Sequence, residues 1–398
     1  MRGDPISPTI EAPTDGVRQP ETRATPLISV VIPCLNEAQS IGEAVRRARQ
    51  ALDDNGFQGE VIVADNGSTD GSPALAEAAG ARVVHEQRRG YGSAYLAGFA
   101  AAKGDYIVMA DADLTYDFSE IPRFVEQLEA GGELVMGNRM QNIKPGAMPW
   151  HHRYIGNPVL TGILNLFFRT GVRDAHCGMR AVRRDALQGL NLRSPGMEFA
   201  SEMVIRAAKH GLDIREIPIE YHPRAGESKL SSFRDGWRHL RFLLVHSPTY
   251  LFVIPGALMT VLGVLIMLTV LGDISVFGRP WDLHTMIVGT LGTVVGTQVL
   301  ALGFAARAYG VWYLGERDPW FSRMEERLRL EHGLLAGGAI LLVGLALVTF
   351  IGVKWLQQGG GELSETQLAL FAATLIIVGL QIFFSSFLIS ILALRRVE

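Results

Sequence analysis

The sequence predicts a mainly parallel α/β domain followed by an all-α membrane domain of four helices. In the first half, short apolar runs alternate with helical segments of about 10–15 residues, a pattern typical of βαβ units. Beyond Leu240, four uncharged apolar runs follow, each with the roughly 20 residues needed to cross a hydrocarbon core. We divide the chain into a polar tail (1–26), an α/β domain (27–230), an amphipathic segment (231–248) and a membrane domain (249–398).

Composition narrows the classes of function. The net charge is −3 at pH 7, without the basic excess of nucleic-acid-binding domains, so we expect no nucleic-acid partner. Cys34 and Cys177 give no disulfide framework, and we expect both as reduced thiols. Residues 1–26 are polar and Pro-rich, show no signal-peptide pattern, and are expected to be disordered.

The first strands of the α/β domain are predicted from apolar runs that are bounded by turn residues. The turn-rich stretch Asn66–Gly71 can cap the helix that comes after the second strand. In a mainly parallel sheet, ligands bind beyond the carboxyl ends of the strands. We expect strands at Leu27–Cys34, Glu60–Asp65, Arg82–His85 and Tyr106–Ala110, and helices at about Ala38–Leu52 and Ser93–Ala102.

The stretch Tyr106–Tyr116 carries a chemical signal. Its strand ends in Asp111-Ala112-Asp113, and alternation along an extended backbone would put both carboxylates on one side. Neighbouring carboxylates repel each other, and a divalent cation such as Mg²⁺ relieves this while also binding phosphate oxygens. The triplet therefore indicates a metal site that carries a diphosphate, although two solvated or helix-capping acids in a loop would give the same pattern. Asp65 and the residues after Cys34 also follow strands, which favours the metal site.

In the rest of the α/β domain, strand and helix patterns alternate less clearly. Glu202 is a candidate for catalysis or acceptor positioning, with a solvated helix face or a buried salt bridge as alternatives. The helices at Arg153–Arg169 and Phe233–His246 fit the profile of elements in the bilayer interface, and an ordinary core-facing helix is the alternative for Arg153–Arg169. We also expect a helix at Phe199–His210, a strand at Ile214–Tyr221 and a basic, flexible loop at Arg224–Lys229.

Charge around the apolar runs predicts the topology. The loop between the second and third runs carries several arginines, whereas the first loop has only Arg279 and the third only Lys354. By the positive-inside rule, both termini, the α/β domain and the Arg-rich loop are expected in the cytoplasm, at the plasma membrane if the protein is bacterial. The predicted spans are Tyr250–Leu271, Met286–Ala306, Leu334–Val353 and Leu368–Leu394.

Small and polar residues inside the runs predict helix packing. Gly292-x-x-x-Gly296 and Gly333-x-x-x-Gly337 would let helices approach closely, within or between protomers, so a homo-oligomer through the membrane domain is one expectation. Gln298 and Gln381 are expected to hydrogen-bond between helices rather than to contact lipid phosphate.

An ordered set of segments between Ser29 and Leu230 resembles a known family. They are IPCLNE, VIVADNGSTDGS, RRGYGSAYLAG, DADLTYD, GNRM, DAHCGMRAVRRDAL and RAGESKL. Together they resemble the family-2 glycosyltransferases, whose GT-A fold is a Rossmann-like α/β domain. More narrowly, they resemble the polyprenyl-phosphate (dolichyl-phosphate) hexose synthases, and the tail resembles small four-helix GtrA-like membrane proteins.

The resemblance implies a role for each matching position. Pro33, Glu37, Asp65, Asn66, Gly90 and Ala112 would belong to the nucleotide-sugar site, with the first three holding base and ribose. Asp111 and Asp113 would bind Mg²⁺ or Mn²⁺ and the diphosphate and act in catalysis with Arg139 and Glu202, Arg139 also contacting the donor. Arg180, Arg224, Ser228 and Lys229 would bind the acceptor phosphate. Many relatives have two aspartates where this chain has Asp65-Asn66, which leaves the nucleotide open.

The resemblance implies inverting, metal-dependent transfer of a hexose to polyprenyl phosphate at the cytoplasmic leaflet, from UDP-glucose or GDP-mannose. The residues suit this chemistry, because metal and arginines stabilise a diphosphate leaving group. A phosphate monoester is largely ionised near neutral pH, so no strong protein base is required. Two alternatives stay open. One is a processive polysaccharide synthase, whose usual Gln-x-x-Arg-Trp motif is not found here, and the other is a non-catalytic carrier or flippase component.

Overall fold

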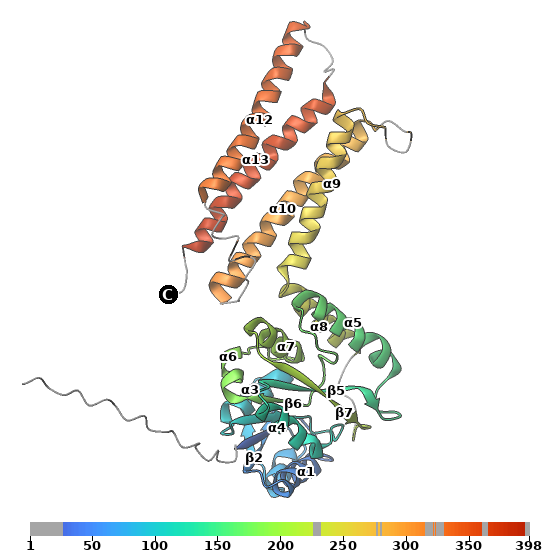
Figure 1. The fold of residues 1–398 in the computed structure, drawn as a ribbon, viewed down its shortest axis with the longest axis vertical. Coiled ribbons are helices and arrows are strands. Elements are labelled where there is room, and N and C mark those ends of the chain that lie inside the picture. Colours follow the sequence, from blue (N-terminus) through green and yellow to red (C-terminus); the bar gives the residue numbers. More distant parts are fainter. Residues whose placement is uncertain are drawn as a thin grey trace, which may run out of the picture.

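The computed structural model describes residues 27–225, 232–275, 278, 281–314, 321, 323, 330–359 and 365–394. An α/β domain lies at one end and a bundle of long helices at the other, and helix α8 (Ser232–Val245) leads from the first to the second (Figure 1). The predicted tail 1–26, and Ser228 and Lys229 of the basic loop, lie outside the described residues.

Within the described residues, seven strands form one sheet in the order β3-β2-β1-β4-β6-β5-β7. Strands β3, β2, β1 and β4 pair with one another in parallel, as do β5 and β7, whereas β6 is antiparallel to both β4 and β5. The predicted mainly parallel sheet is therefore confirmed, but β5 and β6 were not among the predicted strands. The strands are β1 (Ile28–Cys34), β2 (Gly59–Asp65), β3 (Arg82–His85), β4 (Tyr106–Met109), β5 (Leu134–Ile143), β6 (Arg180–Arg183) and β7 (Ile214–Tyr221).

Helices cover both faces of this sheet. On one face, α1, α2 and α4 pack against β1 residues such as Val30 and Ile32, and on the other α3, α6 and α7 pack around Val31. Because both faces are buried, β1 and β2 read as continuous apolar runs. The helices are α1 (Ile41–Asp54), α2 (Ser72–Ala78), α3 (Tyr91–Ala101), α4 (Ile121–Glu129), α5 (Asn157–Phe168), α6 (Arg184–Leu190) and α7 (Phe199–His210), with short turns η1 (Phe118–Glu120) and η2 (His152–Gly156).

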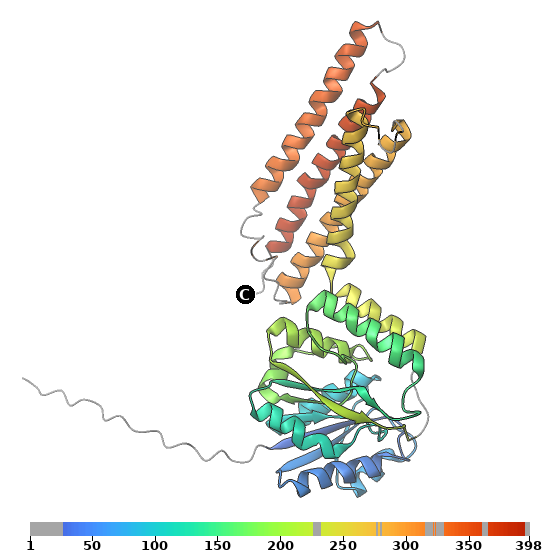
Figure 2. The same cartoon turned by 45° about the vertical axis from the view of Figure 1, so that its right-hand side comes forward.

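Helices α5 and α8 lie side by side on the bundle-facing side of the α/β domain (Figure 2). Leu164 of α5 and Leu243 of α8 are fully buried in the core. Large apolar side chains are exposed on the other side of this segment, among them Leu166 of α5 (60% exposed) and Tyr154 of the preceding turn η2 (66%). Helices are therefore present at both predicted segments, and the one after Arg153 combines a core-facing side with an exposed apolar side. The predicted position of the two helices in the bilayer interface remains a prediction.

The bundle consists of two helical hairpins, α9 with α10 and α12 with α13, which meet where α10 contacts α13. Among the described residues, four helices are long and apolar enough to cross a membrane, as predicted. The orientation remains a prediction. The bundle helices are α9 (Ile254–Leu271), α10 (Leu283–Leu314), α12 (Leu330–Gln357) and α13 (Thr366–Ala393), and the π-helical turn η3 (Thr249–Val253) precedes α9.

The glycines of both predicted packing motifs are used within the chain. A Cβ on Gly296 would lie 2.5 Å from the backbone of α9, and a Cβ on Gly337 would lie 2.7 Å from the backbone of α13. These motifs therefore give no separate support for a homo-oligomer, which remains a prediction. Gln381 Nε2 donates to Gln298 Oε1 at 3.2 Å, so the predicted hydrogen bond between helices is confirmed.

Candidate active site

A cavity of about 460 Å³ lies beyond the carboxyl ends of β1, β2 and β4, where a parallel sheet is expected to bind its ligands. Arg238 and His239 of α8 also line it, so the helix that leads to the bundle forms part of the wall. The cavity brings together most of the predicted site residues, namely Pro33, Glu37, Asn66, Gly90, Asp111, Ala112, Asp113, Arg139 and Arg224.

Asp111-Ala112-Asp113 forms a turn, not the extended continuation of β4 that the alternation argument assumed. The strand ends before the triplet, and Leu114 has a positive φ of 60°. Asp111 Oδ1 accepts a hydrogen bond from the Tyr91 hydroxyl at 2.9 Å. Asp113 Oδ1 accepts from the backbone N–H and the hydroxyl of Thr115, at 3.1 and 2.6 Å. Because these contacts fix both side chains, the turn still presents two carboxylates to one cavity.

The environment of Asp111 disfavours its charge. Burial and the negative charge of Asp113 raise the pKa of Asp111 from 3.8 to about 7, although the Tyr91 hydroxyl and two arginines act in the opposite direction. A cation placed between two neighbouring carboxylates stabilises the ionised form of both. No group of three or more His, Cys, Asp and Glu side chains that could hold a metal occurs in the described part of the chain. The pair therefore fits a hard cation that takes its other ligands from a bound phosphate.

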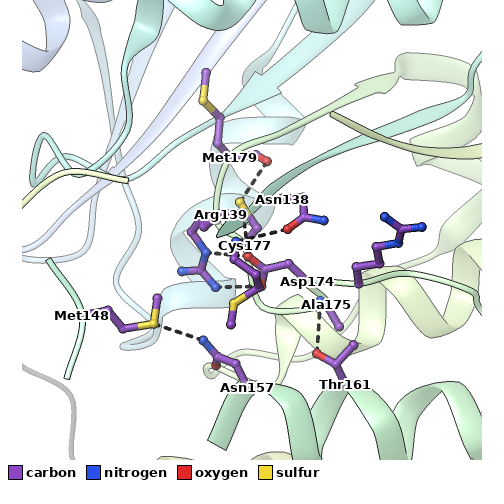
Figure 3. Close-up of polar contacts among 12 residues, drawn as sticks. Asn138, Arg139, Met148, Asn157, Thr161, Asp174, Ala175, Cys177 and Met179 are labelled. Atoms are coloured by element: carbon purple, nitrogen blue, oxygen red, sulfur yellow. Dashed lines mark hydrogen bonds and ion pairs between the residues drawn. The ribbon is translucent and has the colours of Figure 1, made fainter. Parts of the chain in front are cut away.

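Arg139 is held at the cavity wall by a buried ion pair. Its Nε and Nη2 atoms donate to the two carboxylate oxygens of Asp174 at 2.8 and 2.9 Å (Figure 3). Burial opposes the charge of Asp174, but the Arg139 guanidinium outweighs it and holds the pKa of Asp174 below its ordinary value. The third guanidinium nitrogen, Nη1, donates to the Tyr116 hydroxyl at 3.4 Å. The result is a cation of fixed position, suited to phosphate oxygens.

Arg224 supplies a second positive charge at this site. Its Nη2 atom lies 3.1 Å from Asp113 Oδ2. Its Nε atom is buried and has no hydrogen-bond partner in the described structure. The arginine therefore partly neutralises the acidic pair. Ser228 and Lys229, which the sequence placed in the same loop, lie outside the described residues.

Asn66 explains why this chain departs from the Asp-Asp pattern. Its Nδ2 atom donates to the carbonyls of Glu86 and Arg88 at 3.1 and 2.8 Å, and its Oδ1 atom accepts from Gly90 N–H at 2.7 Å. An aspartate could make the last bond but neither of the donations. Gly90 has a φ of 143°, and a Cβ there would lie 2.1 Å from the Pro195 carbonyl oxygen. The Asn66 amide thus holds the loop that ends at Gly90.

Asp65 does not line the cavity, so the predicted contact with base or ribose is not supported. Its carboxylate is buried and accepts hydrogen bonds from the N–H groups of Gly67 and Ser68 at 3.2 and 3.1 Å. His85 Nδ1 lies 3.2 Å from the same carboxylate. The physical reason is local, because the turn after β2 folds its N–H groups back onto the side chain. Asp65 therefore shapes the loop behind the cavity.

The prediction that Arg180 binds the acceptor phosphate is wrong. The side chain is fully buried and does not line the cavity. All three of its nitrogens donate to backbone carbonyls, those of Cys177, Ala200 and Ala175, at 2.8–2.9 Å. Arg180 lies on β6, whose side chains point into the core at this position, so the guanidinium ties the segment before β6 to α7.

A catalytic role for Glu202 is also wrong, and the alternative of a buried salt bridge is confirmed. Glu202 is 3% exposed, and Arg206 Nε donates to its carboxylate at 2.8 Å. The carboxylate also accepts from the N–H groups of Arg193 and Ser194. Glu202 therefore holds the segment before α7, whose Pro195 carbonyl closes against the Gly90 loop.

Several residues that line or support the cavity were not among the predicted site residues. Asp174 fixes Arg139, and Tyr91 binds Asp111. The rings of His176 and His239 lie 4.7 Å apart, edge to face, and both line the cavity. Burial lowers the pKa of His176 well below its ordinary value, so this ring is neutral. Asp174 and His176 stand in the DAHCGMR segment, whereas His239 has no local signal.

The chain is similar to several proteins of known sequence. Agl6, a low-salt glycan biosynthesis hexosyltransferase of Haloferax volcanii, is 42% identical over 366 residues, which are 92% of this chain and 88% of the relative. The dolichyl-phosphate hexose transferase of the same organism is 34% identical over 211 residues, 52% and 89% of the two chains. The undecaprenyl-phosphate 4-deoxy-4-formamido-L-arabinose transferase of Pseudomonas aeruginosa is 31% identical over 303 residues, 72% and 86%.

Fold, cavity and relatives together define a membrane-attached α/β transferase. Residues 29–190 match glycosyl transferase family 2, and residues 304–393 match the C-terminal transmembrane region of that family. The chain belongs to glycosyl transferase family 2, which confirms the resemblance seen in the motifs. Among solved structures, the glucosyl-3-phosphoglycerate synthase of Mycobacterium tuberculosis with Mn²⁺, UDP and glucosyl-3-phosphoglycerate is 25% identical, with a TM-score of 0.46 over 56% of this chain and 80% of that one.

Proposed function

We propose that this glycosyltransferase moves a hexose from a nucleotide sugar to polyprenyl phosphate at the cytoplasmic leaflet. One observation carries the proposal. The acidic pair and Arg139 share a cavity with Arg238 and His239 of α8, the helix that leads into the bundle. A lipid phosphate stays at headgroup depth because its tail lies in the bilayer, so its enzyme needs a cavity beside the membrane. The names of two relatives, which specify dolichyl and undecaprenyl phosphate, support this class of acceptor.

Asp111 and Asp113 would hold Mg²⁺ or Mn²⁺ together with the donor diphosphate. When bound, such a cation stabilises the charge that develops on the leaving diphosphate. The protein supplies the remaining positive charge, from Arg139, which Asp174 fixes, and from Arg224 beside Asp113. Guanidinium groups in fixed positions stabilise a charge that grows during the reaction without having to reorganise.

The donor and the acceptor would approach from different walls of the cavity. Pro33, Glu37 and the loop that ends at Gly90 would surround the base and ribose. Arg224, together with Ser228 and Lys229, would meet the acceptor phosphate near α8. That phosphate is already ionised near neutral pH and attacks the anomeric carbon directly. A single displacement from the side opposite the leaving group inverts the configuration.

The proposal is tested by transfer of radiolabelled sugar from a panel of UDP- and GDP-sugars into polyprenyl phosphate, using the full-length protein. We expect an organic-soluble product from one donor, loss of product in EDTA, and recovery with Mn²⁺ or Mg²⁺. Asp111→Asn and Asp113→Asn should each lower turnover at least a hundredfold, whereas the exposed Asp54→Asn should leave it within twofold. Full activity of the two cavity variants, or activity unaffected by EDTA, would overturn the metal site.

The same assay separates the other candidate functions. A processive polysaccharide synthase would give a long polymer that does not extract into organic solvent, and a carrier without catalysis would give no labelled product from any donor. Chemical analysis of the anomeric configuration in the lipid product tests inversion, because retention would require a different mechanism.

A further inference from the structure

Arg139 lies where the pairing between β5 and β7 is interrupted. Residues 139–141 of β5 stand opposite a single residue of β7, Ile219, because the register shifts between Asn138 and Asn142. A bulge of this kind leaves residues of the longer strand unpaired and redirects their side chains. The position of the Arg139 guanidinium at the cavity wall therefore depends on contacts outside the ladder with β7.

Asp174 takes the place of a strand partner for Arg139. Besides the two guanidinium bonds (Figure 3), the backbone N–H of Arg139 donates to Asp174 Oδ2 at 3.1 Å. Asp174 is fully buried and stands in the loop between α5 and β6. The backbone of this loop therefore sets the orientation of the carboxylate, and with it the position of the guanidinium.

Glu216 of β7 holds that loop. Its carboxylate accepts the backbone N–H of Arg173 at 2.8 and 2.9 Å and the N–H of Asp174 at 3.0 Å. The next residue, Ile217, is buried in the core on one face of the sheet, so alternation along the strand turns Glu216 to the opposite face. Hydrogen bonds to an ionised acceptor are short and strong, so Glu216 fixes the backbone of the residue that binds Arg139.

We propose that Glu216 is a positioning residue, which holds Arg139 at the donor diphosphate through Asp174. This inference rests on the proposed function, in which Arg139 stabilises the charge on the leaving diphosphate. Glu216 does not line the cavity, so its effect on a bound nucleotide passes through the other two side chains. Strand β7 also ends just before Arg224, so the same strand helps to position both arginines.

The neighbouring parts of the loop have anchors of their own. Asn165 Nδ2 donates to the Val172 carbonyl at 2.7 Å, and Arg180 Nη2 donates to the Ala175 carbonyl at 2.8 Å. Removing the Glu216 carboxylate should therefore leave the loop folded but loosen its middle part. A displacement of about 1 Å near a reacting group can cost about a hundredfold in rate, so even a partial shift should be measurable.

The test compares Glu216→Ala with Glu133→Ala in the full-length protein in detergent. Glu133 is a matched control, because its carboxylate also accepts a backbone N–H, from Asp213 at 2.9 Å, just before β5 and β7 begin. A nucleoside diphosphate carries the charge that the leaving group develops, so calorimetric titration with UDP and with GDP in the presence of Mn²⁺ reports on Arg139. We expect Glu216→Ala to bind the nucleotide about tenfold more weakly than the wild type, and Glu133→Ala to stay within about twofold.

Two further variants separate positioning from a general loss of structure. Glu216→Gln keeps a carbonyl oxygen for the two N–H groups, so it should bind within about threefold of the wild type. In the background of Arg139→Lys, Glu216→Ala should cause little further loss, because the side chain that it positions is already altered. Equal affinities of the wild type and Glu216→Ala, an equal loss in Glu133→Ala, or a full tenfold loss in the Arg139→Lys background would overturn the inference.

The titration needs no acceptor, which separates this inference from the proposed reaction. A wild type that binds a nucleotide but gives no lipid-linked sugar would overturn the proposed acceptor, while the affinities of the variants still decide the role of Glu216. A wild type that binds neither nucleotide would overturn the donor site and this inference together.

Discussion

Replacing Asp111 with asparagine should stabilise the protein in the absence of divalent cations, although it should remove activity. The pKa of Asp111 rises from 3.8 to about 7 on folding, because of burial and the charge of Asp113. Between these values the folded state binds more protons than the unfolded state, so the wild type loses stability as the pH rises through this interval. Asparagine does not titrate, and its advantage should therefore grow with pH and level off above about pH 7.

The size of the effect follows from the shift. About three pKa units, at about 1.4 kcal/mol each, give roughly 4 kcal/mol as an upper value. Asp111 is partly exposed to the cavity, and the asparagine N–H groups need new acceptors, so we expect a net gain of about 1–2 kcal/mol at pH 8. For a domain of this size, that corresponds to a rise of about 2–8 °C in the melting temperature.

Thermal unfolding in detergent with EDTA, at pH 5 and pH 8, measures this effect. Asp54→Asn, on the exposed end of α1, is the matched control and should not shift the melting temperature. Adding Mn²⁺ should raise the melting temperature of the wild type more than that of Asp111→Asn. A melting temperature of Asp111→Asn at or below that of the wild type at pH 8, or an equal advantage at both pH values, would contradict this prediction.

Four further predictions follow from the described contacts. Asp174→Ala should lower the free energy of unfolding by about 3–5 kcal/mol, because it leaves the Arg139 charge buried and unpaired; denaturant titration measures this, and a loss below 1 kcal/mol would contradict it. Asn66→Asp should lower the free energy of unfolding by about 1–3 kcal/mol, because it removes the two hydrogen bonds that the Asn66 amide donates to the Glu86 and Arg88 carbonyls. The same denaturant titration measures this, and an unchanged midpoint would argue against the role of Asn66 in holding the loop that ends at Gly90. Burial raises the pKa of the Cys34 thiol from 9.0 to about 11, so the contribution of this thiol to stability is present below pH 9 and is lost as the pH rises to 11. At pH 8 the Cys34 thiol should resist alkylation until the protein unfolds, and rapid labelling of the folded protein would disprove this. Ser275→Cys should be labelled from outside intact cells, and labelling only after permeabilisation would reverse the predicted orientation.

The sequence alone determined the parts of this protein that depend on local pattern. Strands β1, β2 and β4 and the membrane spans are apolar runs with clear boundaries, and their burial on both faces or in lipid needs no knowledge of distant neighbours. The Asp111–Asp113 pair was found because it follows such a strand. Strand β5 was missed because only its first residues are buried and apolar, while the rest is polar and pairs with β7 across a register shift.

Tertiary structure decided what each charged side chain does. Sequence gives the type of a residue but not the direction in which its element points it. Arg180 and Arg139 both stand in segments that resemble the family. The Arg180 guanidinium is bound by three carbonyls in the core, whereas the Arg139 guanidinium is held at the cavity wall by Asp174. His239 reaches the cavity because α8 packs against α5, which brings the ring within 3.0 Å of the Ser201 hydroxyl of α7. Hydrogen bonds and ion pairs of charged side chains act over short distances, and hydrogen bonds are directional. The role of a charged residue therefore depends on which distant segments fold against it.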